Sequence, residues 1–348
     1  MTLIGIMKRA TLAAALAAAV WLSASGAMAE SAADFYKGKT VRLAVGTSPG
    51  GGFDTYARRL APYLQKKLGA TVIVENRPGG SHMVAMNAVY QATPDGLSMM
   101  LAPGEGAVLG KLLGEPGIRF DLNNYPIVAR VNTAPRILII NPKLPYRTLD
   151  DIRKSKKPLV LSFAGKTDGA SDTATVFCHA LKLACKSVIG YPSSKEFTLA
   201  AIRGETDGTV LTDDSAARFS EHDQLRPIVV TGRERSTLMP NVPTVFEATK
   251  VDAEGAWWLD FRDDLRKLGR LLVVTPGTPA DRLAYLRATV RTIETDPAVI
   301  AEFEAKGQPL QYASPEEMST IIAKMLGGSL SKEKVKEIDY VITQEFYK

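Results

Sequence analysis

The segment TSPGGGFDTYARRLAPYLQKKLG, residues 47–69, joins three consecutive glycines, Gly50, Gly51 and Gly52, to the start of an amphipathic helical pattern. Glycine adopts positive φ angles readily and lets another group approach the main chain closely. The free N–H groups at a helix N-terminus, together with its partial positive charge, favour an anion at that end. The segment therefore predicts either a backbone site for a small anion or a tight strand-to-helix turn that binds nothing.

Two different apolar periods flank this loop. Val41, Leu43 and Val45 alternate as in a half-buried strand over 40–45, whereas apolar residues recur at helical spacing over 57–68. The same alternation continues along the chain and predicts an α/β protein with mostly parallel sheets flanked by helices, whose ligands bind at the carboxyl ends of the strands. Further strands are predicted at 71–76, 97–102, 127–131, 137–141, 159–164, 187–191, 209–212, 226–231 and 271–275, and helices at 171–183, 195–203, 280–294 and 315–325.

Length and charge limit the class of protein. The 348 residues exceed the size that one hydrophobic core usually supports, so two domains are expected. The net charge of +6 is dispersed along the chain and forms no basic stripe of the kind that nucleic acid requires. This charge is compatible with an anionic ligand.

The first 29 residues have the three parts of a secretory signal peptide. Lys8 and Arg9 precede an apolar run over 10–22, and small residues end at Ala29, after which cleavage is expected. The apolar run is shorter than the ~20 residues of a spanning helix, although an uncleaved anchor is the alternative. We therefore expect a soluble periplasmic protein, a monomer that begins near Glu30.

A second loop, in LVLSFAGKTDGASDTATVFCHAL at residues 159–181, resembles the first. An apolar strand pattern again leads through Gly165 and Gly169 to a helix that starts near Ser171. Two such loops, more than a hundred residues apart, predict two domains that each direct a helix N-terminus at one cleft. The alternative is that both loops are only turns.

The two cysteines, Cys178 and Cys185, are seven residues apart. On one straight helix their Cα atoms would be about 10 Å apart, which is too far for a disulfide. A bond in an oxidising compartment therefore requires the helix to end before Cys185, and the strand pattern that follows allows this. With only three histidines in the chain, no metal-ligand spacing is visible.

Three spaced blocks and two later segments resemble the substrate-binding proteins of tripartite tricarboxylate transporters, the Bug family. The later segments are LRPIVVTGRERSTLMPNVPTVFEA and LLVVTPGTPADRLAYLRATV, and the resemblance extends over nearly all of the chain after the signal peptide. The blocks are Pro49-Gly50-Gly51 with Asp54, Ala57 and Arg58, then Glu75-Asn76-Arg77-Pro78-Gly79, then Pro94-Asp95-Gly96.

The resemblance implies a two-lobed periplasmic binding protein whose chain crosses twice between the lobes. Lobe one is expected at 38–135 plus 268–348, and lobe two at 136–267. A small organic carboxylate would bind between the lobes, which would close by hinge bending and present the ligand to a membrane permease. In this interpretation the ligand-binding residues are Thr47, Gly50, Gly51, Gly52, Phe53 and Asp54 in lobe one and Gly169, Ala170, Ser171, Tyr191 and Asp213 in lobe two.

The chain departs from the family pattern at three places. GSHMVA follows the second block, Asp172-Thr173 replaces a Ser-His pair, and 259–269 resembles an insertion near the second crossing. Backbone contacts are therefore expected to transfer better than side-chain contacts. Asp54 has two alternatives, since it would either cap the helix or contact a ligand hydroxyl or amine.

An enzyme is the rival class of protein. No Lys-[Ser/Thr] follows the glycines as in a P-loop, and neither Gly-x-Ser-x-Gly nor His-Glu-x-x-His occurs in the chain. We therefore expect no catalytic residue, metal or cofactor. A receptor that reports its ligand to a membrane sensor instead of a permease is a further alternative.

Overall fold

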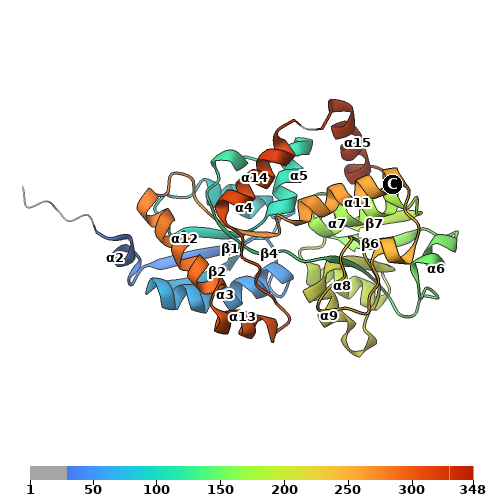
Figure 1. Cartoon of the computed structure of the whole chain (residues 1–348), viewed down its shortest axis with the longest axis horizontal. Coiled ribbons are helices and arrows are strands. Elements are labelled where there is room, and N and C mark those ends of the chain that lie inside the picture. Colours follow the sequence, from blue (N-terminus) through green and yellow to red (C-terminus); the bar gives the residue numbers. More distant parts are fainter. Residues whose placement is uncertain (1–29, 329, 348) are drawn as a thin grey trace, which may run out of the picture.

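The computed structural model describes residues 30–328 and 330–347, so the expected signal peptide lies outside the described residues. Figure 1 shows two α/β halves side by side along the long axis of the molecule, each built on one five-stranded sheet. We call the sheets A and B and name each half after its sheet. No helix among residues 30–328 and 330–347 is long and apolar enough to cross a bilayer.

Sheets A and B have the same order of strand directions. In each sheet four strands point the same way and one runs against them, β10 in sheet A and β5 in sheet B. In spatial order, sheet A is β2 (Thr71–Asn76), β1 (Thr40–Val45), β3 (Ser98–Pro103), β10 (Arg270–Val274) and β4 (Ile127–Asn132), and sheet B is β7 (Cys185–Ile189), β6 (Leu159–Phe163), β8 (Gly208–Thr212), β5 (Arg136–Ile140) and β9 (Arg226–Val230).

The two reversed strands are the ones on which the chain crosses between the halves. The chain leaves β4 through residues 133–135 and enters β5, and it returns from α11 (Ala253–Arg266) through 267–269 into β10. A strand that starts at the junction must run away from it, whereas the other strands end there. The sequence prediction of mostly parallel sheets thus holds for four strands of each sheet and misses these two.

Helices cover the sheets on both faces. α3 packs against β1 and β2, while α7 packs against sheet B and against α11. The remaining helices are α2 (Ala32–Tyr36), α3 (Gly52–Leu68), α4 (Met83–Tyr90), α5 (Gly104–Leu113), α6 (Leu149–Lys154), α7 (Gly169–Ala180), α8 (Ser194–Arg203), α9 (Asp213–Ser220), α10 (Val245–Ala248), α12 (Ala280–Glu294), α13 (Pro297–Glu304), α14 (Pro315–Leu326) and α15 (Lys332–Thr343), with short 3-10 turns at Leu122–Asn124 and Glu221–Asp223.

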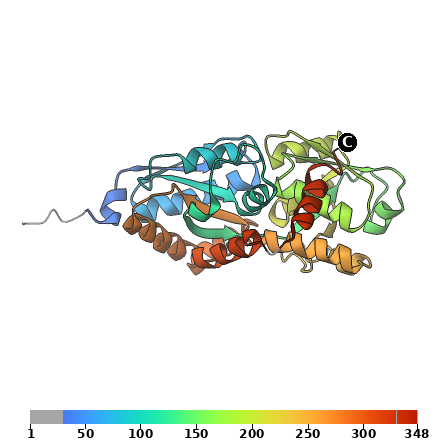
Figure 2. The same ribbon diagram turned by 90° about the horizontal axis from the view of Figure 1, so that it is seen from above.

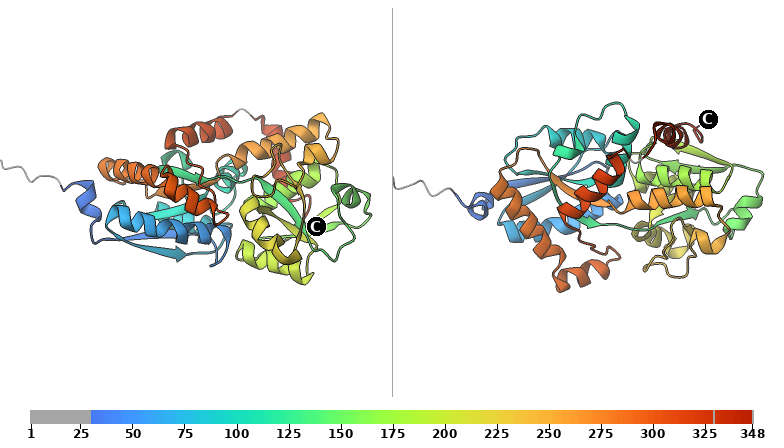
Figure 3. Two further views of the ribbon diagram at one scale, coloured as in Figure 1. Left: turned by 60° about the horizontal axis from the view of Figure 1, so that its bottom comes forward. Right: turned by 45° about the horizontal axis from the view of Figure 1, so that its top comes forward.

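The C-terminal helix differs from the expectation that residues 268–348 stay in one lobe. α14 packs against β4, but α15 packs against α7 and α5, and Figures 2 and 3 show it lying over the sheet B half. Ile338, Val341 and Ile342 are fully buried on α15, and the N–H of Ser187 on β7 donates to the carbonyl of Phe346 at 2.7 Å. Burial of this apolar face explains why the chain passes to the sheet B half a second time.

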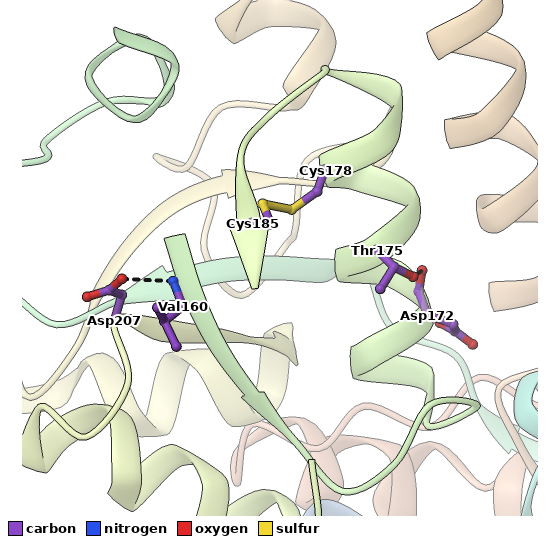
Figure 4. Close-up of a disulfide and its surroundings, with 6 residues drawn as sticks. All are labelled: Val160, Asp172, Thr175, Cys178, Cys185 and Asp207. Carbon is purple, nitrogen blue, oxygen red and sulfur yellow. Dashed lines mark hydrogen bonds between the residues drawn. A yellow bond between two sulfur atoms is a disulfide. The ribbon is translucent and has the colours of Figure 1, made fainter. Parts of the chain in front are cut away.

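The predicted disulfide is present between Cys178 and Cys185 (Figure 4). α7 ends at Ala180, Lys182 adopts a left-handed φ of 55°, and β7 begins at Cys185 itself. The chain reversal brings the two Cα atoms to 6.3 Å, within the range that a disulfide spans. The requirement that the helix end before Cys185 is confirmed, although the strand begins two residues earlier than predicted.

We expect the double variant Cys178→Ala/Cys185→Ala to lower the free energy of unfolding by about 2 kcal/mol, because the bond closes a short loop. Urea unfolding with and without reductant measures this difference. Reductant should destabilise the parent by a similar amount and leave the double variant unchanged. A parent whose unfolding curve does not move with reductant would contradict the expectation.

Candidate functional site

A cavity of about 460 Å³ lies between the two halves, at the carboxyl ends of the strands that run toward the junction. Its walls are the loops after β1, β2 and β3 on the sheet A side and the loops after β6, β7 and β8 on the sheet B side. Both crossing segments also reach it, through Asn132 to Arg136 and through Arg266 to Arg270. This is the position expected for a ligand in sheets of this kind.

The structure brings six of the eleven predicted ligand residues into the cavity wall. The other five lie outside it, some of them directly behind the wall. The lining set is Thr47, Gly52, Phe53, Gly169, Ala170 and Tyr191, and the set outside the wall is Gly50, Gly51, Asp54, Ser171 and Asp213.

Gly50 and Gly51 face the sheet B half rather than the cavity. A Cβ on Gly51 would lie 3.2 Å from the Ser194 hydroxyl and 3.4 Å from Cβ of Ser193. The N–H of Gly52 donates to the same Ser194 hydroxyl at 3.3 Å. Only Gly50 has a positive φ, 89°, while Gly51 is extended at −76°. The bare backbone in this loop therefore admits the opposite half of the protein, and Gly52 and Thr47 remain to face a ligand.

Asp54 holds the glycine loop from the first turn of α3. Its carboxylate accepts the Gly50 N–H at 2.8 Å, pairs with Arg58 at 2.9 Å and accepts from the Asn76 amide at 2.9 Å. Burial alone would raise the pKa of Asp54, but these hydrogen bonds lower it overall. Of the two alternatives for Asp54, this geometry favours a structural role over ligand contact.

The second glycine loop ends at α7, whose N-terminus lies against acidic side chains. Asp168 is the N-cap residue of α7 and lines the cavity. A Cβ on Gly169 would overlap the carboxylate of Glu105 and the guanidinium of Arg136, so only glycine fits there. The Ser171 hydroxyl is hydrogen-bonded to that of Tyr347 at 2.6 Å and is fully buried.

A buried ion-pair network connects the two halves beside this loop. Glu105 on α5 pairs with Arg136 and, at 2.7 Å, with Arg262, which in turn pairs with Asp172 on α7 at 2.6 Å. Arg262 also donates to the carbonyl of Gly169 at 2.9 Å. Burial would raise the pKa of Glu105, but the two guanidinium groups hold it well below its usual range. The stretch interpreted as an insertion, 259–269, is the end of α11, and it supplies Arg262.

Unpaired polar atoms gather at the cavity. Of the twelve buried side-chain N and O atoms without a hydrogen-bond partner among residues 30–328 and 330–347, five belong to residues in its wall. Because buried polar groups are almost always hydrogen-bonded, such a group of atoms indicates a site for a polar ligand. The five atoms are Thr47 Oγ1, His82 Nδ1, Arg136 Nε, Asp168 Oδ2 and Arg270 Nε.

Arg270 places a fixed positive charge at the N-terminus of α3. A Cβ on Gly52 would lie 3.0 Å from its Nη2, and its guanidinium stacks over the ring of Tyr56 at 4.3 Å. The Asn132 amide oxygen accepts from Nη1, and Asp214 lies 3.6 Å from Nη2. Arg270 and the N–H groups of α3 together favour an anion at this end of the cavity.

His82 occupies a strained position in the loop after β2. Its φ is 76°, in the left-handed region that non-glycine residues rarely adopt, and its ring packs edge-on against Phe53 with centroids 4.6 Å apart. Burial lowers the pKa of His82 to about 4, so the ring is neutral near pH 7. His82 therefore offers the cavity a neutral hydrogen-bonding nitrogen. The departure GSHMVA, noted in the sequence, includes this residue.

Tyr191 and Asp213 follow β7 and β8 as expected but have different positions. Tyr191 lines the cavity. Asp213 accepts a hydrogen bond from the Ser236 hydroxyl at 2.7 Å and from the N–H of Asp214 at 2.8 Å, behind the wall. Burial raises the pKa of Asp213 to about 6.

The sequence interpretation missed the charged residues of the cavity. Arg136 and Arg270 each stand directly before an apolar strand, in RILII and RLLVV, at the two crossings. A lone arginine at the entrance of an otherwise apolar strand is the signal that could have identified them. Glu105 and His82 carry no comparable signal, because only the fold brings them to the cavity.

One group of potential metal ligands lies outside the cavity. His179, Glu254 and Glu337 bring ligand atoms within 4.8 Å of one another on α7, α11 and α15. Glu337 already pairs with Lys334 at 2.8 Å and His179 with Glu345 at 2.9 Å. We assign no metal to this group.

Comparison with known proteins is consistent across sequence and structure. The family model described as tripartite tricarboxylate transporter family receptor matches residues 56–329. A protein of Bordetella pertussis from the uncharacterised group UPF0065 is 27% identical over 304 residues, which cover 85% of this chain and 89% of that protein. Protein BugT of the same organism is 24% identical over 308 residues, which cover 87% of this chain and 91% of BugT.

Two solved structures share the fold. The periplasmic binding protein BugD superposes with a TM-score of 0.73 at 20% identity, covering 89% of this chain and all of BugD. MatC of Rhodopseudomonas palustris superposes with a TM-score of 0.71 at 19% identity, covering 86% of this chain and 98% of MatC. The match of the family model over most of the chain, on a fold of two α/β halves that enclose a polar cavity, shows that this protein belongs to the receptors of the tripartite tricarboxylate transporter family.

Proposed function

We propose that this protein is a periplasmic receptor that encloses a small organic carboxylate between two lobes and delivers it to the membrane permease of a tripartite tricarboxylate-type transporter. The observation that carries the proposal is the cavity of about 460 Å³, into which five residues with unpaired buried polar atoms converge from both halves. A cavity of this size suits a small organic acid.

The carboxylate is assigned to the end of the cavity formed by Thr47, Gly52 and Arg270. This end combines a helix N-terminus, a guanidinium group and an unpaired buried hydroxyl, all of which donate hydrogen bonds. MatC, which has the same fold, holds a bound malate, and a carboxylate ligand here agrees with that observation.

Closure is assigned to the contacts between the loop after β1 and the loop after β7. The Ser48 N–H donates to the Pro192 carbonyl at 3.3 Å, and the Gly52 N–H donates to Ser194. We propose that lobe one is 38–135 plus 268 onward to the end of α14, that lobe two is 136–267, and that α15 belongs with lobe two. These contacts would form when the lobes close on the ligand and break when they open.

The secreted form is proposed to be a monomer that starts near Glu30, after cleavage at Ala29. The proposal rests on the signal-like pattern of residues 1–29 and on the described chain beginning its first helix at Ala32. We assign a binding role and no catalysis, in keeping with a family of receptors.

A thermal-unfolding screen of the secreted protein against small organic acids tests the proposal. A ligand that binds only the folded state at a hundredfold excess over its Kd should stabilise it by ~2.7 kcal/mol. Inorganic sulfate and phosphate at equal concentration serve as controls for nonspecific anion effects. If no organic acid raises the unfolding temperature above these controls, the proposed function is wrong. Deletion of the gene should in addition abolish uptake of the acid that binds.

A further inference from the structure

The two ends of the cavity differ in the charge that they offer a ligand. At the α3 end, Arg270 and the helix N-terminus donate hydrogen bonds. At the α7 end, the position that would suit a second ligand carboxylate is already adjacent to two carboxylates of the protein, Asp168 and Glu105. A symmetrical diacid therefore meets opposite conditions at the two ends.

The two carboxylates at the α7 end are not equivalent. Both oxygens of Glu105 are hydrogen-bonded, one to Arg136 and the other to Arg262. Asp168 lines the cavity, and its Oδ2 is buried without a partner among the residues that the structure describes. Asp168 is thus an acceptor that a ligand could satisfy.

The charges around Asp168 do not balance. Three carboxylates, on Glu105, Asp168 and Asp172, stand beside two guanidinium groups, on Arg136 and Arg262. Burial raises the pKa of Asp168 to about 6, although Arg136 opposes the shift. Near pH 7.5 the carboxylate is ionised, and the group lacks one positive charge.

We infer that the ligand is a zwitterion, with a carboxylate at the α3 end near Arg270 and an ammonium group at the α7 end that donates to Asp168. The inference rests on the proposed function and specifies its ligand class. The ammonium supplies both the missing charge and the missing hydrogen-bond donor. A second carboxylate in its place would lie against Asp168, where two like charges in a buried site repel strongly.

Isothermal titration at pH 7.5 with matched ligands tests this inference. Amino acids of three to six carbons, with the amino group at each possible position, are compared with the dicarboxylate and the monocarboxylate of equal chain length. We expect the tightest ligand to be an amino acid that binds at least tenfold more tightly than its matched dicarboxylate. A dicarboxylate that binds as tightly as the best amino acid, or more tightly, would overturn the inference and leave the proposed function standing. Binding of none of these acids would overturn both.

The variant Asp168→Asn identifies the residue responsible. Asparagine has nearly the same shape and is an equally good N-cap residue, so α7 should be retained. We expect its affinity for the best amino acid to fall at least tenfold and its affinity for the matched dicarboxylate to rise. Asp150→Asn, the same change at an exposed position on α6, should alter neither. An Asp168→Asn variant that keeps the parent's preference, with its unfolding temperature unchanged, would overturn the assignment.

Discussion

Gly51→Val should weaken ligand binding about a hundredfold while the protein remains folded. The backbone of Gly51 is extended, with φ −76° and ψ 170°, which valine adopts without strain. The new side chain would instead meet Ser193 and Ser194 of the opposite half, because even a Cβ would lie 3.2 Å from the Ser194 hydroxyl. A variant that reaches the closed state a hundred times less often loses the same factor in apparent affinity.

Isothermal titration of Gly51→Val with an acid from the screen measures this loss. Gly51→Ala should show a smaller effect, because a single methyl group at 3.2 Å requires only a small shift of Ser194. Arg58→Ala serves as a control on the same helix, since Arg58 is half exposed and pairs with Asp54 outside the cavity wall. Binding by Gly51→Val at parental strength, with a strong loss in Arg58→Ala, would show that closure at this loop does not govern affinity.

Arg262→Leu should lower the free energy of unfolding by about 3–5 kcal/mol, because removing one partner of a buried ion pair leaves the remaining charge buried and uncompensated. Arg262 is 3% exposed and pairs with both Glu105 and Asp172. Asp172 is fully buried and would have no cation in hydrogen-bond contact.

Denaturant unfolding measures the effect, with Arg203→Leu as the matched control. Arg203 pairs with Glu205 at 2.6 Å, but both side chains are about half exposed, so little change is expected there. Combining Arg262→Leu with Asp172→Leu should cost less than the sum of the single changes, because the pair acts as a unit. If Arg262→Leu is as stable as Arg203→Leu, the network contributes nothing to the fold.

Regular elements with a clear apolar period could be predicted from the sequence. The strands 40–45 and 71–76 and the helix 280–294 have the predicted bounds, because half-buried strands and amphipathic helices carry their period in the side chains. The reversed directions of β5 and β10 could not be predicted, since strand direction depends on where the chain crosses between sheets. The disulfide was predictable because one geometric condition, a helix end before Cys185, decided it.

The site was predictable in its backbone and not in its charges. The loops after β1 and β6 do meet at one cavity, as two glycine-rich helix starts suggested. Which residues face the ligand depends on contacts between the halves, and these turned Gly51 toward Ser194 and filled the N-terminus of α7 with acidic side chains. Such contacts join residues far apart in the chain, so no local pattern reports them.

A crystal structure of the secreted protein with an acid from the screen would test the central claim most directly. We expect the ligand to lie in the cavity between the halves, with its carboxylate hydrogen-bonded to Thr47, to the N–H of Gly52 or to Arg270, and with residues of both sheets in contact with it. A ligand bound outside this cavity, or in contact with one half alone while the other stays apart, would contradict enclosure between two lobes.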